Sequence, residues 1–198
     1  MNERDDLERV MQALEPLPRQ RAFPALVVLV GPPGAGKTSL ARRIAERTPV
    51  AVLAADEVRR LLAPDADFSF TETRRVQRAI RLAVGDLLHR NISVILDSPN
   101  LTEWERQPLY SLAELHGARL ILVEVTAPTE VVMERLAVGA RVAPMGAGSS
   151  GQPQTPRDVH LQQAQRQEPI TREHMSVDTA APAFDQFVTA LAMDLEEG

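Results

Sequence analysis

The stretch Ala25–Ser39, which reads ALVVLVGPPGAGKTS, decides the fold of this chain. Its second part matches G-x-x-x-x-G-K-[ST], the pattern of a phosphate-binding loop. Glycines let backbone N–H groups converge on an oxyanion, a lysine reaches terminal phosphates, and the hydroxyl that follows can hold Mg²⁺. The helix expected after the loop points the positive end of its dipole at the same anion. We therefore expect the loop to bind a nucleotide through Gly31, Pro33, Gly34, Ala35, Gly36, Lys37, Thr38 and Ser39.

Lys37 is the only lysine in a chain with 22 basic residues. A sequence that uses arginine elsewhere and keeps a lysine here indicates that a compact ammonium is required, in place of a planar guanidinium. The single lysine also disfavours a GTPase, because the guanine-reading motif N/T-K-x-D needs a second one. A structural glycine turn between a strand and a helix is the alternative interpretation of the loop.

Composition narrows the class of protein. A chain of 198 residues with 44% hydrophobic content suits one domain with a sizeable core. The net charge of −5 argues against an extended footprint for a polyanion, although it allows a local basic patch. Neither a membrane-spanning run nor a signal peptide is apparent, so we expect a cytoplasmic protein without a membrane partner. The absence of cysteine excludes disulfides and thiolate chemistry, and the four scattered histidines are expected on surface or half-buried helix positions.

Apolar runs that alternate with helical patterns predict an α/β fold with a parallel sheet. Together with the loop, they predict a three-layer P-loop NTPase fold: a five-stranded parallel sheet with helices on both faces and a flexible lid. The strands are expected at 25–30, 50–54, 92–97, 119–125 and 175–178. Helices are expected at 2–15, 37–47, 71–90, from 102, from 128 to 139, at 155–167 and from 182.

We divide the chain into an N-terminal helix with its linker at 1–22 and the phosphate-binding domain at 23–198. The glycine- and serine-rich stretch at about 138–157 is too long for an idle connection and is typical of an active-site lid. Arg135 and Arg141, at the start of this stretch, are well placed to move onto phosphates as the lid closes. A disordered surface insertion is the alternative.

Acidic side chains follow two of the predicted strands, at the edge where ligands bind in open parallel sheets. Asp56 and Arg59 come directly after the second strand, three residues apart, so both can face one cleft. There Asp56 can accept a hydroxyl proton and Arg59 can anchor acceptor or phosphate charge; a local ion pair at a helix start is the alternative. Asp97 ends the third strand and is expected to position Mg²⁺ together with Thr38, while Asn100 follows shortly after.

The helix expected at 71–90 carries Arg74, Arg78 and Arg81 at helical spacing. Such a basic stripe is more often a solvated face, but it would bind an anionic acceptor if it lined the cleft. Phe68 and Phe70 are expected to anchor the preceding loop in the core, with stacking on a substrate ring as the alternative.

Trp104 and Tyr110, the only residues of their kinds, are expected to pack inside the protein.

Four motifs in this order resemble the P-loop kinases of the polynucleotide kinase, zeta toxin and chloramphenicol phosphotransferase type. They are the loop at 31–38, D-E-V-R at 56–59, V-I-L-D-S-P-N at 94–100 and E-R-L-A-V-G-A-R at 134–141. The resemblance covers most of residues 25–190 and implies transfer of the ATP γ-phosphate to a hydroxyl. It implies that Lys37 and Thr38 serve nucleotide and metal, that Asp56 is the base and Arg59 holds the acceptor, and that Asp97 lies near Mg²⁺. The two lid arginines stand farther apart here than in that group.

The leading hypothesis is therefore an ATP-dependent kinase with ATP and Mg²⁺ as cofactors and a small molecule or a nucleic-acid 5′ end as the acceptor. Its catalytic residues would be Lys37, Asp56, Arg135 and Arg141, and its acceptor would contact Asp56, Arg59, Arg74, Arg78 and Asn100. The arginine stripe favours a nucleic acid and the acidic composition favours a small molecule. The alternative is an ATP-binding or ATP-hydrolysing switch without a phosphoryl acceptor. No obligate protein partner is expected.

Overall fold

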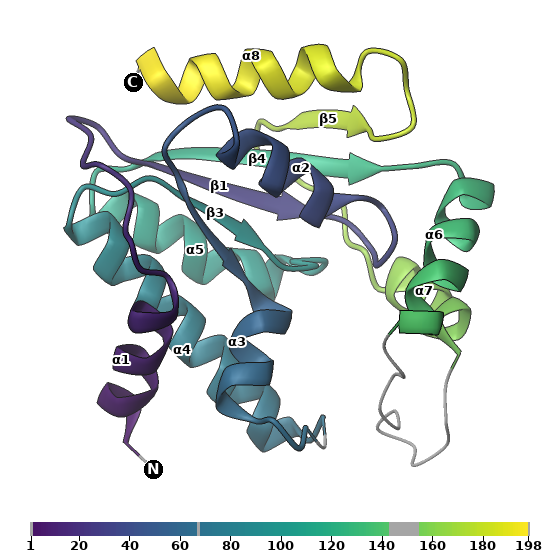
Figure 1. The fold of residues 1–198 in the computed structure, drawn as a ribbon, viewed down its shortest axis with the longest axis horizontal. Coiled ribbons are helices and arrows are strands. Elements are labelled where there is room, and N and C mark those ends of the chain that lie inside the picture. Colours follow the sequence, from purple (N-terminus) through teal and green to yellow (C-terminus); the bar gives the residue numbers. More distant parts are fainter. Residues whose placement is uncertain (1, 67, 143–154, 198) are drawn as a thin grey trace.

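Five parallel strands form the centre of the molecule in a computed structural model that describes residues 2–66, 68–142 and 155–197 (Figure 1). The strand order is β2-β3-β1-β4-β5 and every neighbouring pair is parallel. The strands are β1 (Ala25–Val30), β2 (Ala51–Ala54), β3 (Val94–Asp97), β4 (Arg119–Thr126) and β5 (Met175–Asp178). The predicted five-stranded parallel sheet is confirmed, with strand ends within two residues of those expected.

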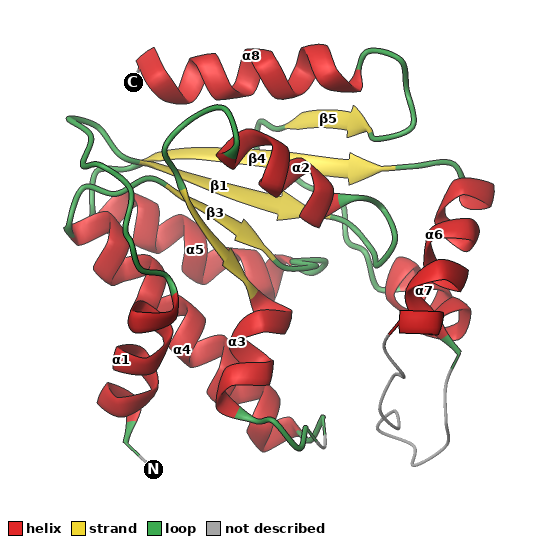
Figure 2. Ribbon diagram, in the orientation of Figure 1, coloured by secondary structure: helices red, strands yellow, loops and turns green. Residues whose placement is uncertain are grey.

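Helices cover both faces of the sheet (Figure 2). One layer contains α2 (Lys37–Ala45) and α8 (Phe184–Glu197). The opposite layer contains α3 (Ala55–Leu62), α4 (Phe70–His89) and α5 (Glu103–Leu115), with α1 (Glu3–Ala13) packed outside α3 and α4. The remaining helices, α6 (Thr129–Val142) and α7 (Pro156–Gln165), lie beyond the carboxyl ends of the strands. None of the described helices is long and apolar enough to span a membrane.

β1 joins the two halves of the core because all six of its residues are buried. Leu26, Val28 and Val30 pack with the apolar faces of α4 and α5, whereas Ala25, Val27 and Leu29 pack with those of α2 and α8. Burial of each such valine or leucine contributes roughly 1.5–3 kcal/mol relative to exposure. The central position of β1 therefore follows from a run that is apolar at both even and odd positions.

Local capping signals place several helix starts where the sequence predicts them. Thr102 and Thr155 each form a capping box, at the starts of α5 and α7.

The predicted end of a helix at Gly139 is wrong, since α6 continues to Val142. One glycine inside a helix costs only about 1 kcal/mol relative to alanine, which neighbouring helical residues can offset. Most of the predicted flexible lid, 143–154, lies outside the described residues.

The exposed aromatic side chains contradict one prediction. Phe68, Phe70 and Trp104 are 42%, 75% and 69% exposed, although they were expected in the core. Ser69 caps α4, so Phe70 is its first residue and lies one turn before Arg74 on the solvent side of the helix. Tyr110 is buried, as predicted.

Candidate functional site

The phosphate-binding loop connects β1 to α2 at the carboxyl edge of the sheet. Gly34 and Gly36 have φ angles of 83° and 103°, which side-chain-bearing residues rarely adopt. A Cβ atom on Gly36 would lie 2.7 Å from the Thr179 Oγ1 atom, and one on Gly34 would lie 2.8 Å from a Val132 methyl carbon. Backbone angle and packing therefore both require glycine at these two positions.

Side chains from distant parts of the chain bind the outer side of this loop. Arg135 Nη1 donates to the carbonyl oxygens of Gly34 at 3.2 Å and Ala35 at 3.3 Å. The buried Thr179 hydroxyl donates to the Ala35 oxygen at 2.7 Å and accepts from Arg135 at 2.8 Å. Contacts to these carbonyl groups hold the loop backbone from outside, an arrangement in which loop N–H groups can face an anion. Arg135 thus contacts the loop backbone, and its predicted phosphate contact stays a prediction. The side chain of Arg141 lies outside the described residues.

His160 of α7 extends the same outer contact. Its Nδ1 atom lies 2.7 Å from the Pro33 carbonyl oxygen, and the side chain is buried. The prediction that every histidine lies on a surface or half-buried position is therefore wrong for His160. The physical reason is that α7 folds back against the loop, a contact that joins residues far apart in the sequence.

Lys37 occupies the inner side of the loop. Its side chain is buried and Nζ donates to the Pro32 carbonyl oxygen at 3.0 Å. Burial lowers the pKa of the Lys37 ammonium to about 8, while the Asp97 and Asp56 carboxylates act in the opposite direction. The two predicted acidic groups therefore lie close enough to the ammonium to act on its charge.

Thr38 and Asp97, the predicted metal-binding pair, lie in contact. The Thr38 hydroxyl donates to Asp97 Oδ2 at 2.7 Å. Burial raises the pKa of the Asp97 carboxyl, and the hydrogen bond from Thr38 opposes that effect. A hydroxyl and a carboxylate are the oxygen ligands that Mg²⁺ prefers, so this pair fits the metal that the loop motif implies.

A pocket of about 450 Å³ opens beside the loop, beyond the ends of β2 and β3. We call it the strand-edge pocket. Asp56 and Arg59 both line it, so the prediction that they face one cleft is confirmed. Other residues that line it include Phe68, Arg81, Asn100, Trp104, Gln163 and Arg166.

Arg59 is held in place within the strand-edge pocket. It forms an ion pair with Glu72, and its guanidinium carbon lies 5.0 Å from the centre of the Phe68 ring. Asn100 is buried, and its side-chain amide donates to the carbonyl oxygens of Leu29 at 2.8 Å and Ser98 at 3.1 Å. Asn100 therefore shapes the wall of the pocket through backbone contacts.

The arginine stripe divides between two places. Arg81 lines the strand-edge pocket, whereas Arg74 and Arg78 lie outside it. Arg74 and Arg78 line a neighbouring hollow instead, and their predicted contact with the acceptor stays a prediction. Arg78 lies on the side of α4 opposite the buried Val76 and reaches the Glu3 carboxylate instead, at 2.6 Å.

Arg106 is a structural residue of the site that sequence reasoning missed. It is fully buried, and Nη1 donates to the carbonyl oxygens of Asn100 at 3.0 Å and Leu101 at 2.8 Å. Nη2 donates to the Pro169 oxygen at 3.0 Å. This side chain joins the loop after β3 to the segment after α7, and no local pattern marks an arginine for that role. Thr179 and His160 were missed for the same reason, whereas Arg81 belongs to the arginine stripe that the sequence indicated.

The sequence profile of a family described as AAA domain matches residues 26–170. The chain belongs to this AAA-domain family. The matched part starts in β1 and includes the loop, Asp56, Asp97 and Arg135. No curated protein matches the sequence.

Several solved structures share this fold. A putative kinase from Chloroflexus aurantiacus J-10-fl is 22% identical, with a TM-score of 0.66 and coverage of 89% of this chain and 98% of the other. The Mycobacterium tuberculosis APS kinase CysC, solved with AMPPNP and APS, is 18% identical, with a TM-score of 0.60 and coverage of 90% and 100%. Chaetomium thermophilum Kti12, solved with ADP-AlF3, is 20% identical, with a TM-score of 0.61 and coverage of 86% and 98%. These similarities confirm the predicted P-loop NTPase fold.

Proposed function

We propose that the protein is an ATP-dependent phosphotransferase that moves the γ-phosphate to a hydroxyl of a small molecule or a nucleic-acid 5′ end. One observation carries the proposal: Asp56 lines a pocket for a second molecule and also acts on the charge of Lys37 in the loop. A donor site and an acceptor site therefore adjoin each other across a carboxylate. Names of structures with the same fold, among them an APS kinase and a gluconokinase, agree with this function.

The donor half of the site consists of the loop, Lys37 and the Thr38–Asp97 pair. The loop N–H groups and the Lys37 ammonium would bind the phosphates, and Gly34 and Gly36 allow the loop backbone to pack closely against Val132 and Thr179 on its outer side. Thr38 and Asp97 would hold Mg²⁺ or its bound water. When bound, the metal neutralises negative charge on the phosphates.

The acceptor half of the site consists of Asp56 and Arg59. Asp56 takes the proton of the acceptor hydroxyl as its oxygen attacks the γ-phosphorus, and the bond to the bridging oxygen of the β-phosphate breaks. ADP leaves with that bonding pair, and the proton passes from Asp56 to water. Arg59, already fixed by Glu72 and Phe68, directs its remaining N–H groups into the pocket at little further entropic cost.

Phosphoryl transfer from γ-labelled ATP to a panel of alcohols tests the proposal. We expect label transfer to at least one acceptor and a loss of about 100-fold or more in the Asp56→Asn variant, with ATP affinity within threefold of wild type. Glu57→Gln is the matched control, because Glu57 is an exposed neighbour on α3 that does not line the pocket. If ATP hydrolysis proceeds without transfer to any acceptor and survives Asp56→Asn, the protein is an ATPase switch and the proposal is wrong.

A further inference from the structure

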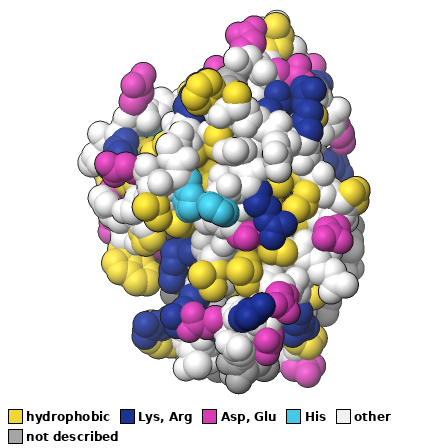
Figure 3. All heavy atoms as spheres, turned by 90° about the vertical axis from the view of Figure 1, so that its left-hand side faces the viewer, with side chains coloured by type: hydrophobic (Ala, Val, Ile, Leu, Met, Phe, Trp, Pro, Cys, Tyr) yellow, Lys and Arg dark blue, Asp and Glu magenta, His cyan; other side chains and the backbone are white. Residues whose placement is uncertain are grey.

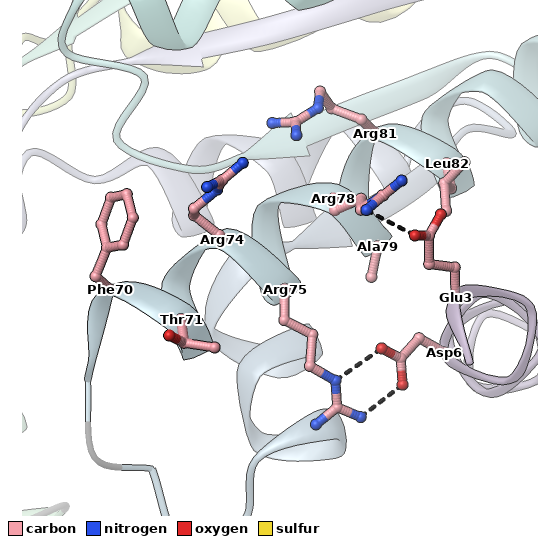
Figure 4. Close-up of a pocket in the computed structure, with 10 residues that line it drawn as sticks. All are labelled: Glu3, Asp6, Phe70, Thr71, Arg74, Arg75, Arg78, Ala79, Arg81 and Leu82. Atoms are coloured by element: carbon pink, nitrogen blue, oxygen red, sulfur yellow. Dashed lines mark hydrogen bonds and ion pairs between the residues drawn. The ribbon is translucent and has the colours of Figure 1, made fainter. Parts of the chain in front are cut away.

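A second hollow, the α1–α4 groove, lies next to the strand-edge pocket. It has a volume of about 670 Å³, and Arg74, Arg78 and Arg81 line it from α4 (Figure 4). Arg81 lines the groove and the strand-edge pocket. The two hollows therefore share the Arg81 side chain, and a molecule that binds Arg81 from the pocket lies next to the groove.

Positive charge in the α1–α4 groove is only partly neutralised. Arg78 pairs with Glu3, but neither Arg74 nor Arg81 forms an ion pair with a carboxylate in the described part of the chain. Burial and the charges of Arg78 and Arg74 lower the pKa of the Arg81 guanidinium. Three cations on one side of a helix repel one another, and an anion bound between them removes that repulsion.

This concentration of arginine is a local feature of an acidic protein. The chain carries a net charge of −5. Figure 3 looks at the end of the molecule opposite the phosphate loop, where basic and acidic side chains are interspersed. In the groove, Asp6 and Glu3 of α1 pair with Arg75 and Arg78, so the unpaired positive charge among its described residues belongs to Arg74 and Arg81.

Aromatic surface is present on the other side of Arg81. Trp104 is 69% exposed and lines the strand-edge pocket, and Phe68 lines it as well. Arg59 already covers a face of Phe68, which leaves Trp104 as the large exposed ring of the pocket. An exposed tryptophan beside arginines is the combination that binds a nucleobase and its phosphate, because the ring stacks and the guanidinium pairs.

We propose that the acceptor hydroxyl belongs to a nucleotide unit, whose base packs against Trp104 and whose phosphate is bound by Arg81 and Arg74. This inference rests on the phosphotransferase function proposed above. A free nucleotide and the first residue of a nucleic-acid strand share this chemistry. A strand would continue along the α1–α4 groove toward Arg78, whereas a free nucleotide would end at Arg81.

Binding can be measured without catalysis, because Trp104 is the only tryptophan and its fluorescence reports on the pocket. A saturating non-hydrolysable ATP analogue fills the donor site first. We then expect a nucleoside 3′-monophosphate to quench the fluorescence, and the unphosphorylated nucleoside to bind about tenfold more weakly because it lacks a charge-assisted contact. Arg81→Gln should remove this tenfold difference. Arg90→Gln, the same charge change at the far end of α4, should preserve it.

Two further ligands complete the test. A short 5′-hydroxyl oligonucleotide that binds more tightly than the monophosphate, with affinity that falls steeply as salt rises, identifies a strand as the source of the nucleotide. If the oligonucleotide and the nucleoside 3′-monophosphate bind equally tightly, with affinities that depend weakly on salt, the acceptor is the free nucleotide. The inference is overturned if neither the oligonucleotide nor the nucleoside 3′-monophosphate quenches the fluorescence of Trp104. It is also overturned if gluconate or a neutral sugar accepts phosphate at least as well as the nucleotides. That last result leaves the phosphotransferase function standing, whereas absence of transfer to every acceptor removes both.

Discussion

The buried ammonium of Lys37 predicts that nucleotide affinity depends on pH in the alkaline range. In the nucleotide-free loop burial lowers the pKa of Lys37 to about 8. Bound phosphates raise that pKa, since they place negative charge beside the ammonium. Binding therefore takes up protons near pH 8, and affinity decreases as pH rises above 8. At pH 9 about one tenth of the free protein keeps the charge, so we expect about tenfold weaker binding than at pH 7.

Calorimetry with a non-hydrolysable ATP analogue between about pH 7.5 and 9.5 measures this effect, in a range where the phosphates themselves no longer titrate. Titrations in buffers of different ionisation enthalpy should show an uptake of about half a proton at pH 8. Lys37→Arg is the control, because a guanidinium stays charged throughout this pH range and its weaker binding should not vary with pH.

The pH dependence of unfolding provides a second, independent measurement of the lowered pKa of Lys37. The unfolded lysine keeps its proton up to a pKa near 10.5, whereas the folded one loses it at about 8. The unfolded state therefore binds more protons between these values, and the Lys37 contribution to stability rises as pH increases from 8 to 10.5. The full difference corresponds to roughly 3 kcal/mol. The reasoning is refuted if nucleotide affinity stays constant between about pH 7.5 and 9.5 and nucleotide binding takes up no proton at pH 8.

The contacts on the outer side of the loop lead to two more predictions. Thr179→Val removes the hydroxyl that binds the Ala35 carbonyl and should lower the free energy of unfolding by about 1–3 kcal/mol, measured by urea denaturation. Nucleotide binding should also become weaker. An unchanged nucleotide affinity would show that this contact does not organise the loop. Gly36→Ala forces a side chain into a φ of 103° and within 2.7 Å of Thr179 Oγ1, so we expect at least tenfold weaker nucleotide binding by calorimetry. A near-normal affinity in Gly36→Ala would show that the loop adjusts without cost.

The parts of this protein that sequence reasoning predicted correctly depend on residues close together in the chain. An apolar run that is buried on both faces predicts β1, and the glycine spacing that follows predicts the loop. Asp56 and Asp97 could be placed near Lys37 because strand ends in a parallel sheet meet at one edge. Capping boxes at Thr102 and Thr155 are likewise patterns of four consecutive residues.

The parts that only the tertiary structure decided depend on which distant segments meet. Thr179 binds the Ala35 carbonyl across 144 positions of sequence, and no pattern around Thr179 indicates that contact. The division of the arginine stripe follows from the rotation of α4 against the sheet and from α1, which supplies Glu3 to Arg78. Phe70 and Trp104 were expected inside because aromatic residues usually bury their rings, but the core was already filled by the branched side chains of the strands and α4. Sequence spacing therefore determined the phosphate loop and its carboxylates, while packing between remote segments determined how the loop is held and which residue of the arginine stripe lines the strand-edge pocket.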